Sequence, residues 1–198
     1  MRNTSTINVK KLTYLAMLTA LVVVLQLAGS FIKLGMFSIS LVLVPIVVGA
    51  AICGPLAGAW LGLVFAVVVL LSGDASAFLT VDPFGTVVVV VFKGVLAGFA
   101  SGLLYALIAK RNKYAAVFTS AVVCPVVNTG IFLLGCLVFF MDTISGWAEG
   151  LGYASAGSYM ILGLAGGNFL FELLFNILLA PMIVTIINMA PRLIGKKR

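Results

Sequence analysis

Six long apolar runs dominate the sequence and restrict it to a membrane fold. They lie at residues 11–28, 38–53, 55–72, 85–109, 115–141 and 159–190. With 63% hydrophobic and only 9% charged residues, the chain of 198 residues has too few polar side chains to cover a soluble domain. The runs exceed the length of barrel strands and lack a two-residue alternation, so we expect helices. The sequence therefore predicts an all-α membrane protein, in which residues 1–198 form a single integral-membrane domain, a bundle of six transmembrane helices.

Basic residues gather in three clusters between the runs and indicate the orientation of the bundle. The clusters are Lys10 with Lys11, then residues 110–113, then the tail at 196–198, whereas Asp74, Asp82, Asp142 and Glu149 fall in the alternate connections. The positive-inside rule then places both termini in the cytoplasm, as expected for a multi-pass protein of a prokaryotic cytoplasmic membrane. The formal net charge of +7 is thus a topology signal, with contacts to anionic lipids, and we expect no nucleic-acid partner.

The second run is short, and it leaves an alternative open. Its 16 positions cover about 24 Å at 1.5 Å per residue, and Gly54-Pro55 separates it from the third run. The two runs could form one interrupted unit, but five spans would put the cluster at 110–113 opposite the N-terminus. Six spans are therefore favoured. Glycines four residues apart in the third and fourth runs (Gly54, Gly58, Gly62 and Gly94, Gly98, Gly102) predict faces along which helices approach closely.

A polar stripe interrupts the last apolar run. Asn168, Glu172 and Asn176 recur every fourth residue, so on a helix they share one face. Burying them in hydrocarbon costs several kcal/mol unless they face protein, water or a ligand. We interpret the stripe as one wall of a solute site, with Asn176 and Glu172 deeper and more structural than Asn168.

Polar residues in two other runs lie at a similar depth. Lys93 and Asn168 are about eight and nine positions from the outer ends of their runs, which makes both roughly 12–14 Å deep. Asn128 and Thr129 follow Pro125, which frees a backbone carbonyl for hydrogen bonding. The predicted substrate-binding residues are Lys93, Asn128, Thr129, Asn168 and Glu172. Two structural alternatives stay open: Lys93 pairs with Glu172, and the asparagines bond between helices.

The sequence carries no enzyme signature. It has no His, no phosphate-binding loop and no acid pair beside a nucleophile, so we expect neither catalysis nor a metal or cofactor site. Cys53, Cys124 and Cys136 lie within apolar runs and are expected to pack there. Connections 28–37, 73–84 and 142–158 are long and contain glycine, which suggests lids over a site on the outer side.

Several motifs in fixed order resemble the substrate-binding S component of an energy-coupling factor (ECF) type vitamin importer. They are Ala16-Met17-Leu18-Thr19-Ala20, then Val44–Gly49 leading into Gly54–Gly58, the Gly-rich fourth run, and Asn168–Glu172 with Asn176 and Pro181. The resemblance implies a six-helix bundle with an outward-opening vitamin pocket. It also implies a membrane scaffold (T) subunit and two cytoplasmic ATPase subunits as partners, with Ala16 and Ala20 as the docking positions.

The choice of solute rests on the composition of the predicted site. One Lys, several amides and few nearby aromatic residues favour a small hydroxylated monocarboxylate such as pantothenate over folate, flavin or thiamine. Riboflavin and a pyridoxine-like solute remain open. Two functions of other classes compete with the importer subunit: an autonomous proton-coupled carrier that uses Glu172, and a ligand-free scaffold protein.

Overall fold

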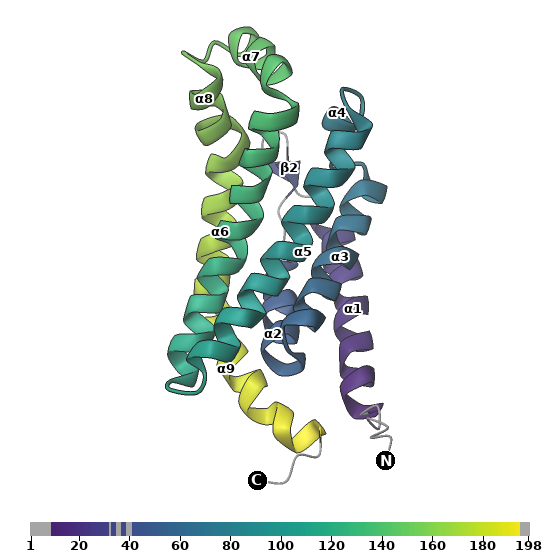
Figure 1. Ribbon diagram of the computed structural model, residues 1–198, viewed down its shortest axis with the longest axis vertical. Coiled ribbons are helices and arrows are strands. Elements are labelled where there is room, and N and C mark those ends of the chain that lie inside the picture. The colour runs from purple at the N-terminus through teal and green to yellow at the C-terminus, as the bar shows by residue number, and fades with distance from the viewer. Residues whose placement is uncertain (1–8, 32, 35–36, 39–40, 195–198) are drawn as a thin grey trace, which may run out of the picture.

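The protein is a bundle of long helices that run side by side along its long axis (Figure 1). The computed structural model describes residues 9–31, 33–34, 37–38 and 41–194. Within these ranges, five helical segments are long and apolar enough to cross a membrane. They are α1 (Val9–Gly29), α3 (Pro55–Ser72), α5 (Pro83–Ile108), α6 (Lys113–Phe139) and the continuous segment Ala156–Met189. The predicted all-helical membrane architecture is therefore confirmed.

The second apolar run is only partly helical. α2 (Leu43–Cys53) has 11 residues and is about 16 Å long, too short to cross a bilayer alone. Before it, β1 (Lys33–Leu34) and β2 (Phe37–Ser38) form a small antiparallel ribbon that the sequence did not predict. Gly54 has φ 98°, a left-handed value that favours glycine, and Pro55 then starts α3. The turn separates α2 from α3, and the two helices pack on one another.

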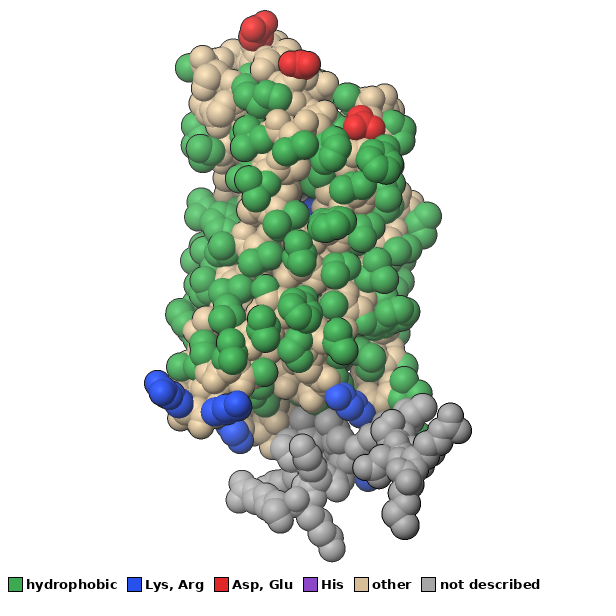
Figure 2. All heavy atoms as spheres, viewed as in Figure 1, with side chains coloured by type: hydrophobic (Ala, Val, Ile, Leu, Met, Phe, Trp, Pro, Cys, Tyr) green, Lys and Arg blue, Asp and Glu red, His purple; other side chains and the backbone are tan. Residues whose placement is uncertain are grey.

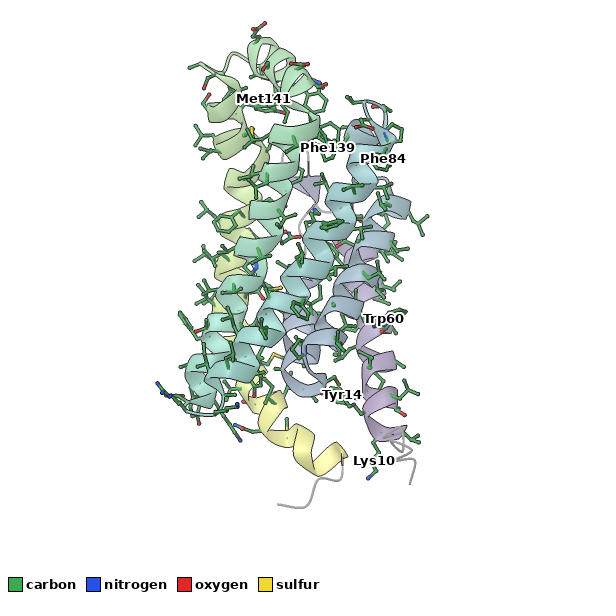
Figure 3. The ribbon with its side chains drawn as sticks, in the orientation of Figure 1. Lys10, Tyr14, Trp60, Phe84, Phe139 and Met141 are labelled. Carbon is green, nitrogen blue, oxygen red and sulfur yellow. The ribbon has the colours of Figure 1, made fainter. Side chains whose placement is uncertain are left out.

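Charges separate to the two ends of the bundle (Figure 2). α1 begins and α9 (Gly167–Ile194) ends at one end, and the exposed residues Lys110, Arg111 and Lys113 lie there at the α5–α6 turn (Figure 1). The acidic side chains visible on this face of the molecule lie at the other end, whereas Glu172 is buried inside the bundle. In Figure 3, Lys10 lies at the basic end, with Tyr14 and Trp60 next along the axis. This segregation agrees with the predicted orientation, which stays a prediction; the basic tail at 196–198 lies outside the described residues.

Helices α3 and α5 approach one another through glycine. A Cβ at Gly58 would meet the carbonyl oxygen of Gly98, and one at Gly62 would meet that of Gly94. The reverse contacts hold as well, so backbone faces backbone along this seam. The predicted close approach is confirmed for Gly58 with Gly98 and for Gly62 with Gly94, whereas a Cβ at Gly54 would meet nothing within 4 Å.

Short helices cap the end opposite the basic one. The long connections contain α4 (Ser76–Leu79), α7 (Met141–Gly150) and α8 (Ala156–Ser158). The Phe78 ring meets those of Phe132, Phe140 and Trp147 edge to face, with centroids 5.7, 4.9 and 5.4 Å apart. These contacts tie the α3–α5 connection to α6 and α7. Two of the three connections predicted to be lids, 73–84 and 142–158, thus contain packed helices, and their role as lids stays a prediction.

A π-helix precedes the polar stripe. η1 (Tyr159–Gly166) joins α8 to α9, and no sequence pattern predicted it. A Cβ at Gly163 would meet the ring of Tyr159, so glycine lets this wide turn close around an aromatic side chain. π-helical segments are rare and occur frequently at functional sites, which directs attention to the residues just after Gly166.

Candidate functional site

A cavity lies among the helices in the half of the bundle toward the acidic end. Its volume is about 70 Å³, which holds a few water molecules and is smaller than the roughly 300–1,000 Å³ of typical small-molecule sites, so a larger solute requires the walls to move apart. Its lining comes from α1, α3, α4, α5, α6, η1 and α9 and from the connections after α3 and α6. The lining residues are Gln26, Phe65, Val69, Asp74, Ala75, Phe78, Thr86, Val89, Val90, Lys93, Asn128, Thr129, Phe132, Phe140, Leu164, Ala165, Asn168, Phe169 and Glu172.

All five residues that the sequence predicted for substrate binding line this one cavity. Lys93 comes from α5, Asn128 and Thr129 from α6, and Asn168 and Glu172 from α9. Asn176, the third member of the polar stripe, does not line it. Its amide Nδ2 donates to the backbone oxygen of Glu172 at 2.8 Å, a contact within α9. The stripe therefore divides into a cavity-lining part and a structural part.

Lys93 lies between two aromatic rings. Its ammonium nitrogen is 5.7 Å from the ring centroid of Phe65 and 5.4 Å from that of Phe132. Cations over aromatic faces at such distances gain about 0.5–2 kcal/mol. Glu172 and Asp74 are close enough to act on the ammonium electrostatically. Lys93 thus lines the cavity over two aromatic rings and within electrostatic reach of two carboxyl groups.

The amides of the site leave buried acceptors without donors. Asn168 donates weakly from Nδ2 to Oε1 of Glu172 at 3.4 Å, and Glu172 is only 2% exposed. Among the described residues, the carbonyl oxygens of Asn128 and Asn168 have no hydrogen-bond partner. Each such buried acceptor costs about 1–3 kcal/mol unless a donor reaches it. The interhelical bonds considered for Asn128 are therefore not formed in this part of the chain.

Gln26 and Asp74 belong to the cavity, and the sequence did not assign them to it. Asp74 Oδ2 accepts three hydrogen bonds: from Gln26 Nε2 at 2.9 Å, from Ser30 Oγ at 2.6 Å and from Ser72 Oγ at 2.9 Å. The cluster ties the outer end of α1 to the connection after α3. Gln26 is 1% exposed. One amide within the apolar run 11–28 was the available signal, but only tertiary packing shows that it faces this site.

The expectation of few aromatic residues near the site is wrong. Five rings line the cavity, and they come from α3, α4, α6, α9 and the connection after α6. They are Phe65, Phe78, Phe132, Phe140 and Phe169. Because they are far apart in the chain, no local cluster marked them in the sequence. The aromatic lining therefore gives no reason to exclude solutes that contain a ring.

The two predicted docking positions lie on an open face of α1. Ala16 and Ala20 are both exposed, and Met17 between them is 66% exposed. On the side toward the bundle, Trp60 Nε1 of α3 donates to Thr19 Oγ1 at 3.2 Å. The face that carries the two alanines is thus free of contacts from the described residues of this chain that would bury it, and its role in docking stays a prediction.

Together, the fold and the cavity define a class: a helical membrane protein that encloses a cavity with polar and aromatic walls. A family model for the ECF transporter substrate-specific component matches residues 10–184. The chain therefore belongs to this family and is a substrate-binding S component of an ECF importer, a multi-pass membrane protein. It is a transport subunit rather than an enzyme, and it works with a T subunit and ATPase partners.

A solved structure gives the same fold. The structure of ThiT from Listeria monocytogenes superposes with a TM-score of 0.57 at 19% sequence identity, and the match covers 93% of this chain and 96% of that chain. At this identity the likeness concerns the fold alone. No curated protein matches the sequence.

Proposed function

We propose that this S component captures a small water-soluble vitamin from the outside in the cavity between α5, α6 and α9. In this proposal Lys93, Asn128, Thr129, Asn168 and Glu172 contact the solute, and the scaffold subunit and two ATPases drive its delivery inward. The observation that carries the proposal is the convergence of these five residues, from three helices, on one cavity. Polar groups this deep in a membrane protein are costly unless they serve a site of this kind.

Reconstitution tests the proposal directly. Vesicles that contain this chain, the scaffold and both ATPases are expected to accumulate the vitamin only when ATP is enclosed. Vesicles with this chain alone are expected to accumulate nothing. ATP-independent uptake driven by a proton gradient in the second preparation would favour the autonomous carrier that uses Glu172, and would contradict the proposal.

We also propose that the α1 face with Ala16 and Ala20 docks on the scaffold subunit. Small residues four apart let two helices approach closely in lipid, and both alanines are exposed. Ala16→Leu or Ala20→Leu is expected to abolish co-purification with the scaffold while solute affinity stays unchanged. Ala106→Leu is the matched control because Ala106 is exposed on α5. Complex formation by both α1 variants would refute the docking face.

The identity of the vitamin belongs to the proposal as well. Pantothenate, riboflavin and a pyridoxine-like solute are the candidates from the sequence. The aromatic lining of five phenylalanines supports the two candidates that contain a planar ring, because ring faces stack on aromatic side chains. Pantothenate has no ring to use these walls.

A further inference from the structure

Two carboxyl groups fix the orientation of two amides in the cavity wall. Gln26 turns its Nε2 toward Asp74 Oδ2 at 2.9 Å, and Asn168 turns its Nδ2 toward Glu172 Oε1 at 3.4 Å. A carboxylate accepts hydrogen bonds and does not donate them, so it holds the NH₂ end of each amide. The carbonyl end of each amide is then left over. This pairing decides the chemistry that the wall can offer to a solute.

The leftover carbonyl oxygens need donors. Oε1 of Gln26, Oδ1 of Asn128 and Oδ1 of Asn168 have no hydrogen-bond partner among the described residues. Gln26 and Asn128 are only 1% and 5% exposed, so bulk water does not hydrate their side chains freely. The three residues stand on α1, α6 and α9 and line the same cavity. A buried acceptor is stable only when a donor reaches it, so this wall favours a solute with several N–H or O–H groups.

The charges and rings of the lining point to the same kind of solute. The cavity lining contains two carboxyl groups, those of Asp74 and Glu172, and one ammonium group, that of Lys93. The rings of Phe65 and Phe132 already hold this ammonium, which shows that their faces accept positive charge. A carboxylate on the solute would meet one cation and two groups of its own sign, whereas a neutral or positive ring would meet aromatic faces and acceptors.

We infer that the cavity takes a planar nitrogen heterocycle that carries N–H or O–H donors and is neutral or cationic, and that it selects against solutes with a carboxylate. This inference rests on the proposed function, since it names the substrate class of the same site. The donors of the solute satisfy the carbonyl oxygens of Gln26, Asn128 and Asn168. The ring of the solute packs among the phenylalanines.

Matched pairs of compounds test the inference on the purified full chain in lipid nanodiscs. Calorimetric titration compares nicotinamide with nicotinate and pyridoxine with 4-pyridoxate, each pair differing by a carboxylate, and adds thiamine, riboflavin, biotin and pantothenate. We expect the tightest binder to be a donor-bearing ring without a carboxylate, and each carboxylate to bind at least about 10-fold more weakly than its partner. A carboxylate as the tightest binder would overturn the inference and leave the proposed function standing. Binding by no compound would count against both.

Variants at Asn128 separate recognition from structure, using the tightest compound of that panel as the probe. Asn128→Leu removes the acceptor and is expected to weaken binding at least about 10-fold, whereas Asn128→Asp keeps an acceptor and is expected to bind a cationic probe as well as the wild type or better. Asn176→Leu is the control, because Asn176 is equally buried with a carbonyl oxygen that lacks a partner, yet lies outside the cavity. Equal affinity of Asn128→Leu and the wild type would refute the proposal that unpaired carbonyl oxygens in the cavity wall bind donors of the solute.

Discussion

Helices α5 and α6 carry buried polar groups at two levels, and the two levels are built differently. At the level nearer the basic end, Ser101 and Ser120 bond reciprocally: Ser120 Oγ donates to the Ser101 backbone oxygen at 3.0 Å, and Ser101 Oγ to that of Ser120 at 3.4 Å. Eight residues along each helix, about 12 Å away, Lys93 and Asn128 line the cavity. There, Asn128 Oδ1 has no partner among the described residues.

The difference between the levels shows how to distinguish a structural polar group from a binding one. Both serines are fully buried, and each is satisfied by the other helix, so their level is closed. Asn128 is nearly as buried, but the donor for its carbonyl oxygen must come from water or a solute. Burial alone does not separate the two roles, and neither does an unpaired oxygen alone, because Asn176 Oδ1 also has no partner among the described residues although Asn176 lies outside the cavity. A binding group is both unpaired and part of the cavity lining.

The largest effect is expected on the free energy of unfolding, from a substitution near the serine level, where the backbones of α5 and α3 are in contact. Gly98→Leu puts a side chain against the carbonyl oxygen of Gly58, so the helices must separate. We expect a loss of more than about 3 kcal/mol in the free energy of unfolding, seen as a large drop in the thermal midpoint in detergent. Gly130→Leu on α6 is the control, because a Cβ there meets open space. Equal thermal midpoints for both variants would contradict the backbone contact between α3 and α5.

A smaller effect is expected at the cavity level, which contains Lys93 and Asn128. It concerns the affinity for the solute rather than the stability of the fold. Lys93→Met removes the ammonium between Phe65 and Phe132 and leaves the two carboxyl groups without an opposing charge in the lining. We expect an anionic solute to lose at least about 10-fold in affinity, since charge-assisted hydrogen bonds contribute about 1.5–3 kcal/mol. A neutral solute is expected to keep its affinity. Titration calorimetry with both solutes measures the ratio, and an unchanged ratio would remove Lys93 from the site.

The smallest effect is expected from the reciprocal serine bonds. Replacing Ser101 and Ser120 together by Ala removes both hydroxyls and leaves only backbone groups that the helices themselves satisfy. We expect a loss of about 1–2 kcal/mol in the free energy of unfolding and no change in solute affinity. Thermal denaturation and calorimetry on the same sample measure the two quantities. A weaker solute affinity with an unchanged free energy of unfolding would show that the serines belong to the binding site, and would contradict the distinction between the two levels.

Local sequence patterns predicted a large part of this architecture. Hydropathy predicted the helical membrane fold, because backbone groups in hydrocarbon must bond within their own segment. The spacing of four between glycines predicted the α3–α5 seam. Counting residues along the helices placed Lys93 and Asn168 at one depth and Asn128 about one turn deeper, with Glu172, and all four residues line a common cavity. Each of these features depends on positions close together in the chain or on helix geometry alone.

Other features required the rotation and packing of whole helices. Gln26 joined the site because Asp74, 48 residues away, accepts its amide hydrogen. The five phenylalanines of the lining come from separate elements. The sequence therefore predicted the polar residues of the site but not its aromatic ones. The π-helix η1 has no recognisable signature in the sequence, since a π-helix differs from an α-helix only in hydrogen-bond register.

The sequence by itself determined that this chain is a membrane protein, where its long helices lie and which polar residues lie deep within them. Those properties follow from composition and from the fixed rise of a helix. Only the tertiary structure decided which polar groups satisfy one another and which remain open to a solute. Satisfaction depends on a donor and an acceptor meeting within about 3 Å, and elements far apart in the chain set that distance.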